Sequence, residues 1–214
     1  MQLSPLLRSS LKLSTRVRKY TIVRTPPANA PRECPTPLLF VSAAKWDADS
    51  AKGIDSLSTV LTSKGFTCIH SDLSPKTTTE CPTALIDGFV HELKSELRLS
   101  GYASFFPPVI FGRAGASLIA QAYISSNPVS AMMLMGNIPA KNAEVPKTLL
   151  SAPLEEFNFE PKFPISLLTT PQHMQHLLEH NRLARAGVSR YAVDELDGQE
   201  ALLKIEEWLD KLGI

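Results

Sequence analysis

The sequence has few of the residues and patterns that identify several common classes of protein. It has three cysteines, Cys34, Cys68 and Cys81, whose odd number and wide spacing indicate neither a disulfide framework nor a zinc site. We interpret all three as structural thiols. No apolar run approaches the roughly 18 residues of a membrane-spanning helix. Aromatic residues make up 7% of the 214 residues, charged residues 20% and apolar residues 43%. These are ordinary values for one globular domain of moderate size.

The first 32 residues contain no acidic residue. They hold seven of the chain's 22 lysines and arginines, so the formal charge of +1 conceals a charge of −6 over residues 33–214. An acidic body does not favour a basic surface for nucleic acid. We therefore expect no nucleic-acid partner for the body of the protein.

The basic start of the chain has the composition of a mitochondrial presequence. Arg8, Lys12 and Arg16 recur every four residues among leucines and serines, which gives one basic stripe if the segment is helical. The sequence RKYT resembles a mitochondrial processing site with the cut after Tyr20. We predict a presequence over residues 1–20 that directs the protein into the mitochondrial matrix. Deleting residues 1–20 should leave the protein in the cytosol. A flexible arm or a short basic contact with nucleic acid is the alternative interpretation.

A proline-rich linker is predicted over residues 21–37, because five prolines lie between residues 25 and 37. Beyond it, strand-like and helix-like segments alternate over residues 38–214. The expected strands cover residues 38–43, 66–70, 108–111, 130–135, 165–169 and 188–193. The expected helices cover residues 47–64, 82–99, 114–125 and 172–186, with a last helix carrying Leu202, Ile205, Trp208, Leu209 and Leu212. Buried strands alternating with amphipathic helices predict an α/β fold, with a mostly parallel sheet of about six strands and helices on both faces.

One stretch connects a buried strand to a helix through small residues. Residues 109–123 read VIFGRAGASLIAQAY. This resembles the α/β-hydrolase superfamily, in which a strand enters Gly-x-Ser-x-Gly, the nucleophile elbow, and then a helix. The five positions of that motif fall on Gly112, Arg113, Ala114, Gly115 and Ala116. The apex, where the superfamily has its serine, is Ala114, and a methyl group cannot attack a carbonyl.

The resemblance implies other catalytic positions, and these also lack the required residues. Ser42 and Ala43 stand where the superfamily usually has His-Gly in its oxyanion loop. The triad acid should fall within residues 169–172 or at Asn137, and neither place holds an acid. The triad histidine should fall within residues 193–198, but the chain has no histidine beyond residue 180. The resemblance covers residues 37–212 and implies a small α/β-hydrolase-like domain over residues 38–214 without a large lid.

Several other residues are candidates for chemistry or binding. Ser117 is a further candidate nucleophile, but its place within the helix, three residues beyond the apex, favours a structural serine. A histidine stripe at positions 173, 176 and 180 could hold a metal, but solvated or partner-facing histidines are the favoured interpretation. Arg113 lies beside a helix N-terminus and, with Ser42 and Ala114, forms a candidate anion pocket. The favoured alternative is an ion pair between Arg113 and an acid within residues 194–197.

These observations lead to two hypotheses about function. The first is a mitochondrial protein with an α/β-hydrolase fold and no catalysis, which acts as a scaffold, an assembly factor or a ligand-binding protein. The second is a hydrolase of the esterase or thioesterase kind that uses a non-standard catalytic constellation. No cofactor and no metal are expected. A mitochondrial protein of unknown identity is the expected partner, and a small anionic metabolite is a further candidate ligand.

Overall fold

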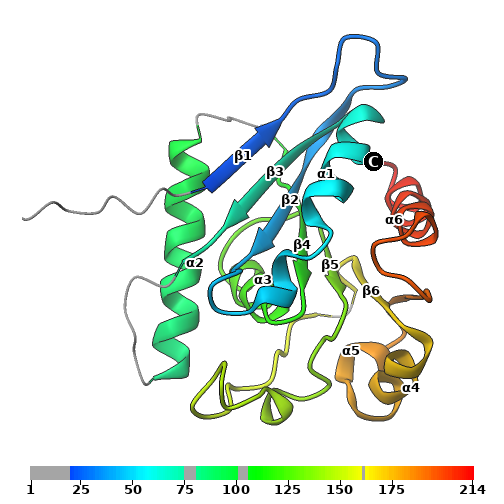
Figure 1. Ribbon diagram of the computed structural model, residues 1–214. Coiled ribbons are helices and arrows are strands. Elements are labelled where there is room, and N and C mark those ends of the chain that lie inside the picture. Colours follow the sequence, from blue (N-terminus) through cyan, green and yellow to red (C-terminus); the bar gives the residue numbers. More distant parts are fainter. Residues whose placement is uncertain (1–19, 75–80, 101–105, 161) are drawn as a thin grey trace, which may run out of the picture.

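A computed structural model describes residues 20–74, 81–100, 106–160 and 162–214 of the chain. Apart from Tyr20, the predicted presequence lies outside these residues. The described part forms a sheet of seven strands in the order β1-β3-β2-β4-β5-β6-β7, with helices on both faces (Figure 1). This confirms the predicted α/β class and the mostly parallel sheet.

The sheet is parallel except at one edge. Its strands are β1 (Tyr20–Arg24), β2 (Cys34–Ser42), β3 (Phe66–Asp72), β4 (Val109–Arg113), β5 (Ala131–Met135), β6 (Ile165–Thr169) and β7 (Ser189–Ala192). β1 pairs antiparallel with β3, and every other neighbouring pair is parallel. β4 lies between β2 and β5, so the turn after β4 stands at the centre of the carboxyl edge of the sheet.

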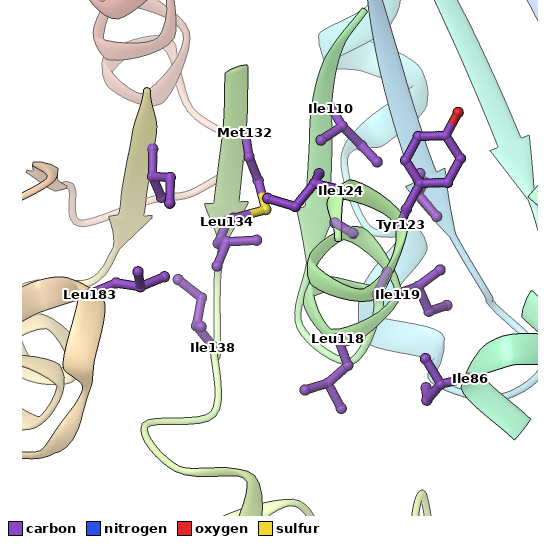
Figure 2. Close-up of a cluster of buried hydrophobic side chains, with 14 of the residues drawn as sticks. Ile86, Ile110, Leu118, Ile119, Tyr123, Ile124, Met132, Leu134, Ile138 and Leu183 are labelled. Atoms are coloured by element: carbon purple, nitrogen blue, oxygen red, sulfur yellow. The ribbon is translucent and has the colours of Figure 1, made fainter. Parts of the chain in front are cut away.

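Helices cover the two faces of the sheet, and the sheet separates two hydrophobic clusters. The helices are η1 (Ala48–Ala51), α1 (Ile54–Ser63), α2 (Pro82–Leu99), α3 (Ala116–Ile124), η2 (Asn142–Glu144), α4 (Pro171–His180), α5 (Arg182–Arg185) and α6 (Gln199–Lys211). Helices α2 to α5 contribute to one cluster, of which Figure 2 shows a part. Helices α1 and α6 contribute to the other cluster, on the opposite face. No helix among the described residues is long and apolar enough to cross a membrane.

The segment predicted as a linker is partly in the sheet. β1 occupies residues 20–24, and β2 begins at Cys34 rather than at Leu38. The β-branched residues after Tyr20 favour an extended chain, and Val23 packs against the core. The prolines at positions 35 and 37 are accommodated because the register with β3 shifts between Cys34 and Leu38. Within the predicted linker, only residues 25–33, between β1 and β2, lie outside the strands.

Two predicted helices are each divided in the structure. Residues 47–64 form η1 and α1, separated by Gly53, whose φ of +69° is a left-handed conformation. Residues 172–186 form α4 and α5, which meet at Asn181. The side chain of Asn181 accepts hydrogen bonds from the amides of Leu183 and Ala184, and so begins a new helix.

Candidate functional site

The turn between β4 and α3 has the geometry of an elbow. Ala114 at its apex has a φ of +49°, and it is the one non-glycine residue with positive φ in the described part of the chain. A Cβ atom at Gly112 would lie 2.8 Å from the carbonyl oxygen of Ala116, and one at Gly115 would lie 2.7 Å from Asp47 Oδ2. The small residues quoted from the sequence are therefore required by close contacts. The strand-to-helix turn is strained at an apex that carries a methyl group.

A carboxylate from another loop binds the amide that follows the apex. The backbone N–H of Gly115 donates to Asp47 Oδ2 over 2.7 Å, at the N-terminal end of α3. The other oxygen of Asp47 accepts from the amide of Asp49 over 3.1 Å and caps η1. In hydrolases with a nucleophile elbow, the amide after the nucleophile stabilises the oxyanion. Here the chain's own anion already occupies that donor.

The loop after β2 is the second place from which an oxyanion donor would come. Its two first amides are also engaged within the protein. The N–H of Ala43 donates to Ser50 Oγ over 2.9 Å, and the N–H of Ala44 donates to Asp72 Oδ1 over 2.9 Å. Ser50 is fully buried and donates in turn to the carbonyl oxygen of Asp47 over 2.6 Å. The same loop that positions the Asp47 carboxylate thus uses its own amides to hold its shape.

A cavity of about 300 Å³ lies over the elbow. Ala114 and Gly115 form part of its wall, together with Asp47, Glu144 and His173. The cavity residues include three carboxylates and no lysine or arginine among those described. An anionic ligand would therefore meet like charge here.

The residues of the candidate anion pocket are not brought together. Ala114 lines the cavity over the elbow, whereas Arg113 lines a different cavity, of about 100 Å³, between α1 and α6. Ser42 is fully buried at the end of β2 and lines neither. The three residues thus do not share either of these two cavities, because adjacent residues at the end of a strand point to opposite faces of the sheet.

Arg113 forms the ion pair that the sequence favoured. Its guanidinium contacts the Asp197 carboxylate and donates to the carbonyl oxygen of Lys52 over 2.6 Å. Arg113 is 8% exposed, whereas the side chain of Asp197 is half exposed. Gly53 allows this approach, since a Cβ there would lie 2.0 Å from Asp197 Oδ1. The loop that would carry a triad histidine therefore supplies a carboxylate that anchors the strand end.

Ser42 belongs to a polar cluster with His70 and Asp72. Its hydroxyl donates to Asp72 Oδ1 over 2.8 Å and lies 2.9 Å from His70 Nε2. Because the hydroxyl hydrogen points to the carboxylate, the imidazole donates to Ser42 Oγ and does not act as its base. Burial lowers the pKa of His70, and the nearby Asp72 charge opposes this effect. The three residue types of a catalytic triad are present, but their hydrogen bonds run in the wrong direction and Ser42 is closed to solvent.

The remaining candidate residues lie away from any reactive arrangement. Ser117 is fully buried, and its hydroxyl has no hydrogen-bond partner within the described residues. His173 donates from Nε2 to the carbonyl oxygen of Ile138 over 2.8 Å, and His176 lies 3.1 Å from Glu144 Oε2. In the part of the chain that the structure describes, no three histidine, cysteine or acidic residues are placed to share a metal ion.

The three cysteines lie in different environments. Cys34 and Cys68 are buried, and burial raises the pKa of both, that of Cys68 to about 11. A thiol with a raised pKa is protonated at neutral pH and is a poor nucleophile. Cys81 is exposed just before α2.

Solved structures resemble this chain over nearly its whole length. An alpha/beta hydrolase enzyme from the metagenome of lagoon sediments of Mar Chica, Morocco, superposes with a TM-score of 0.62 at 10% identity, covering 91% of this chain and 95% of that one. The chain has the α/β-hydrolase fold. A lipase-esterase related protein from Clostridium acetobutylicum gives a TM-score of 0.58 at 11% identity, covering 89% of this chain and 99% of that one. A monoacylglycerol lipase from Paleococcus ferrophilus gives 0.55 at 13% identity, covering 91% and 99%.

The likeness to the α/β-hydrolase fold is one of structure rather than of sequence. No protein-family model matches the sequence, and no curated protein does. Ala114, which the resemblance puts at the apex of the elbow, has the positive φ of a sharp strand-to-helix turn. The sequence identified this position, but it did not indicate that Asp47 would bind the next amide. In the sequence, Asp47 is only the first residue of the single helix predicted over residues 47–64, and nothing local to it indicates the contact.

Proposed function

We propose that this protein is a non-catalytic member of the α/β-hydrolase fold that acts in mitochondria by binding, as a scaffold, an assembly factor or a ligand-binding protein. The contact between the Asp47 carboxylate and the Gly115 amide carries this proposal. A carboxylate at a helix N-terminus is a stable arrangement, because it accepts a hydrogen bond from a free backbone N–H and interacts favourably with the positive end of the helix dipole. In a hydrolase, the amide at the position of Gly115 would donate to the oxyanion of the reacting substrate. Here it donates to Asp47 and stabilises the folded protein.

The charge of the cavity over the elbow narrows the ligand class. Asp47, Asp49 and Glu144 line it, while its apolar surface includes Ile138 and Leu149. A neutral or cationic small molecule with an apolar part matches this lining better than the anionic metabolite expected from the sequence. The space of about 300 Å³ is at the lower end for small-molecule sites.

A hydrolase with a non-standard constellation is the alternative function, and a fluorophosphonate probe distinguishes the two. The purified mature chain should give no covalent adduct in intact-protein mass spectrometry, because Ala114 has no hydroxyl and the Ser117 hydroxyl is buried. A serine hydrolase with an intact triad, labelled in the same tube, is the positive control. Labelling that disappears in Ser117→Ala would overturn the proposal and establish the alternative.

The mitochondrial location rests on the acid-free, amphipathic residues 1–20. Fused to a fluorescent protein, these residues should direct it to mitochondria in living cells. A matched fusion in which Arg8, Lys12 and Arg16 are replaced by glutamine should stay in the cytosol, because import depends on the positive stripe. Equal import of both fusions, or of neither, would contradict this part of the proposal.

A further inference from the structure

A groove of about 550 Å³ lies between α2, α3 and the segment around residues 154–158, away from the elbow. We call it the α2–α3 groove. Its floor continues the hydrophobic core: Figure 2 shows Ile86 of α2 near Leu118 of α3, and both line the groove. Leu154 and Phe157 complete the apolar lining from the other side. The groove is therefore an opening onto packed apolar side chains rather than a polar surface depression.

The wall formed by residues 154–158 is held in place by specific contacts. The amide of Asn142 donates to Glu156 Oε1 over 2.8 Å, and the Asn142 side chain donates to the carbonyl oxygen of Glu155 over 2.6 Å. Phe157 stacks on Phe159 with ring centroids 6.0 Å apart. These contacts fix the wall in place, and a preorganised wall lowers the cost of binding in the groove.

The rim of the groove carries charge of one sign. Asp87, Glu155 and Glu156 line it and are exposed, and none of the described lining residues is a lysine or arginine. Neither Asp87 nor Glu155 has an ion-pair partner within the described part of the chain. The apolar floor favours a ligand with an apolar side, and the acidic rim favours one with basic groups at its edges.

The side chain of Gln121 favours a peptide as that ligand. Gln121 on α3 lines the groove and is 8% exposed, and its side-chain amide has no hydrogen-bond partner among the described residues. The amide oxygen and nitrogen of Gln121 are not among the buried polar atoms that lack a partner, so they are accessible from the groove and can pair with a ligand there. A carboxamide both donates and accepts, as does the peptide group that would pair with it.

From these features we infer that the α2–α3 groove binds a basic, amphipathic peptide segment of a partner protein. Its apolar side chains lie on Ile86, Leu118 and Phe157, and its lysines or arginines meet the acidic rim. The Gln121 amide pairs with the peptide backbone. This site is separate from the cavity over the elbow, so the inference does not depend on whether the elbow is catalytic.

Fluorescence anisotropy of the full chain tests the inference with a labelled peptide of Lys-Leu-Leu-Lys repeats. The matched peptide has glutamate in place of every lysine and should not bind. The double variant Asp87→Asn/Glu155→Gln should weaken binding about tenfold, as expected for two charge contacts at an exposed rim. The control Asp194→Asn/Glu200→Gln changes the net charge equally at exposed acids outside the groove and should leave affinity within about twofold.

The variant Gln121→Leu tests the peptide part of the inference, because it removes the carboxamide at similar volume and without a change of charge. It should weaken binding several-fold while far-ultraviolet circular dichroism shows an intact fold. Equal affinity for both peptides, equal loss in the two double variants, or unchanged affinity in Gln121→Leu would overturn the inference.

Discussion

Replacing Asp47 with alanine should lower the free energy of unfolding by about 2–3 kcal/mol, because two charge-assisted hydrogen bonds are lost at once. One runs from the Gly115 amide and the other from the Asp49 amide, over 2.7 and 3.1 Å. The N-terminus of α3 then has an unsatisfied amide beside a strained turn, and η1 loses its cap. Urea unfolding followed by circular dichroism measures the change.

Asp49→Ala is the matched control for this prediction. Asp49 lies two residues away, its side chain is half exposed, and its carboxylate pairs with Lys52 at the surface over 2.5 Å. An exposed pair of this kind contributes little, so Asp49→Ala should cost less than about 1 kcal/mol. If the two variants lose equal stability, Asp47 does not hold the elbow in the way described.

Replacing Trp208 with alanine should cost about 3–5 kcal/mol, the range for removing a large aromatic side chain from a packed core. Trp208 is 1% exposed on α6 and belongs to the cluster between α6, α1 and the sheet. The loss includes the cavity left under α6, which closes one face of the sheet. A fall of many degrees in the thermal midpoint is the expected readout.

Leu203 provides a control on the same helix. It is 53% exposed, so Leu203→Ala removes apolar surface that water already contacts and should cost less than about 0.5 kcal/mol. A large loss in Leu203→Ala and a small one in Trp208→Ala would mean that α6 presents the opposite face to the sheet.

Much of the fold could be predicted because its signals are periodic and local. The spacing of Leu202, Ile205, Trp208 and Leu209 identifies the buried face of α6, and all four are buried. The apolar runs of the central strands likewise predict burial on both faces, which the fully buried β4 and β5 confirm. The elbow was predictable since small residues in a fixed pattern are required by close contacts.

The first strand and the site contacts could not be predicted in the same way. β1 is an edge strand between a basic segment and a proline-rich segment. The composition of those two segments predicts a presequence and a linker, and the β-branched run at residues 21–23 is too short to predict a strand against it. The pairing of Asp47 with Gly115 joins residues 68 positions apart, and nothing local in either segment encodes it. The sequence could name Arg113 and a range for its acid, but only the fold selects Asp197 within that range.

The hydrolytic activity of Ala114→Ser tests the central claim most directly, since it restores the hydroxyl at the apex of the elbow. Turnover of p-nitrophenyl esters should remain at the background of the wild-type protein. The Gly115 amide is bound by Asp47, and His173, the histidine that lines the same cavity, donates its Nε2 hydrogen to the carbonyl oxygen of Ile138. A serine without a base and without an oxyanion donor remains an unactivated alcohol. Ester hydrolysis well above background in Ala114→Ser, abolished by adding His173→Asn, would contradict the account.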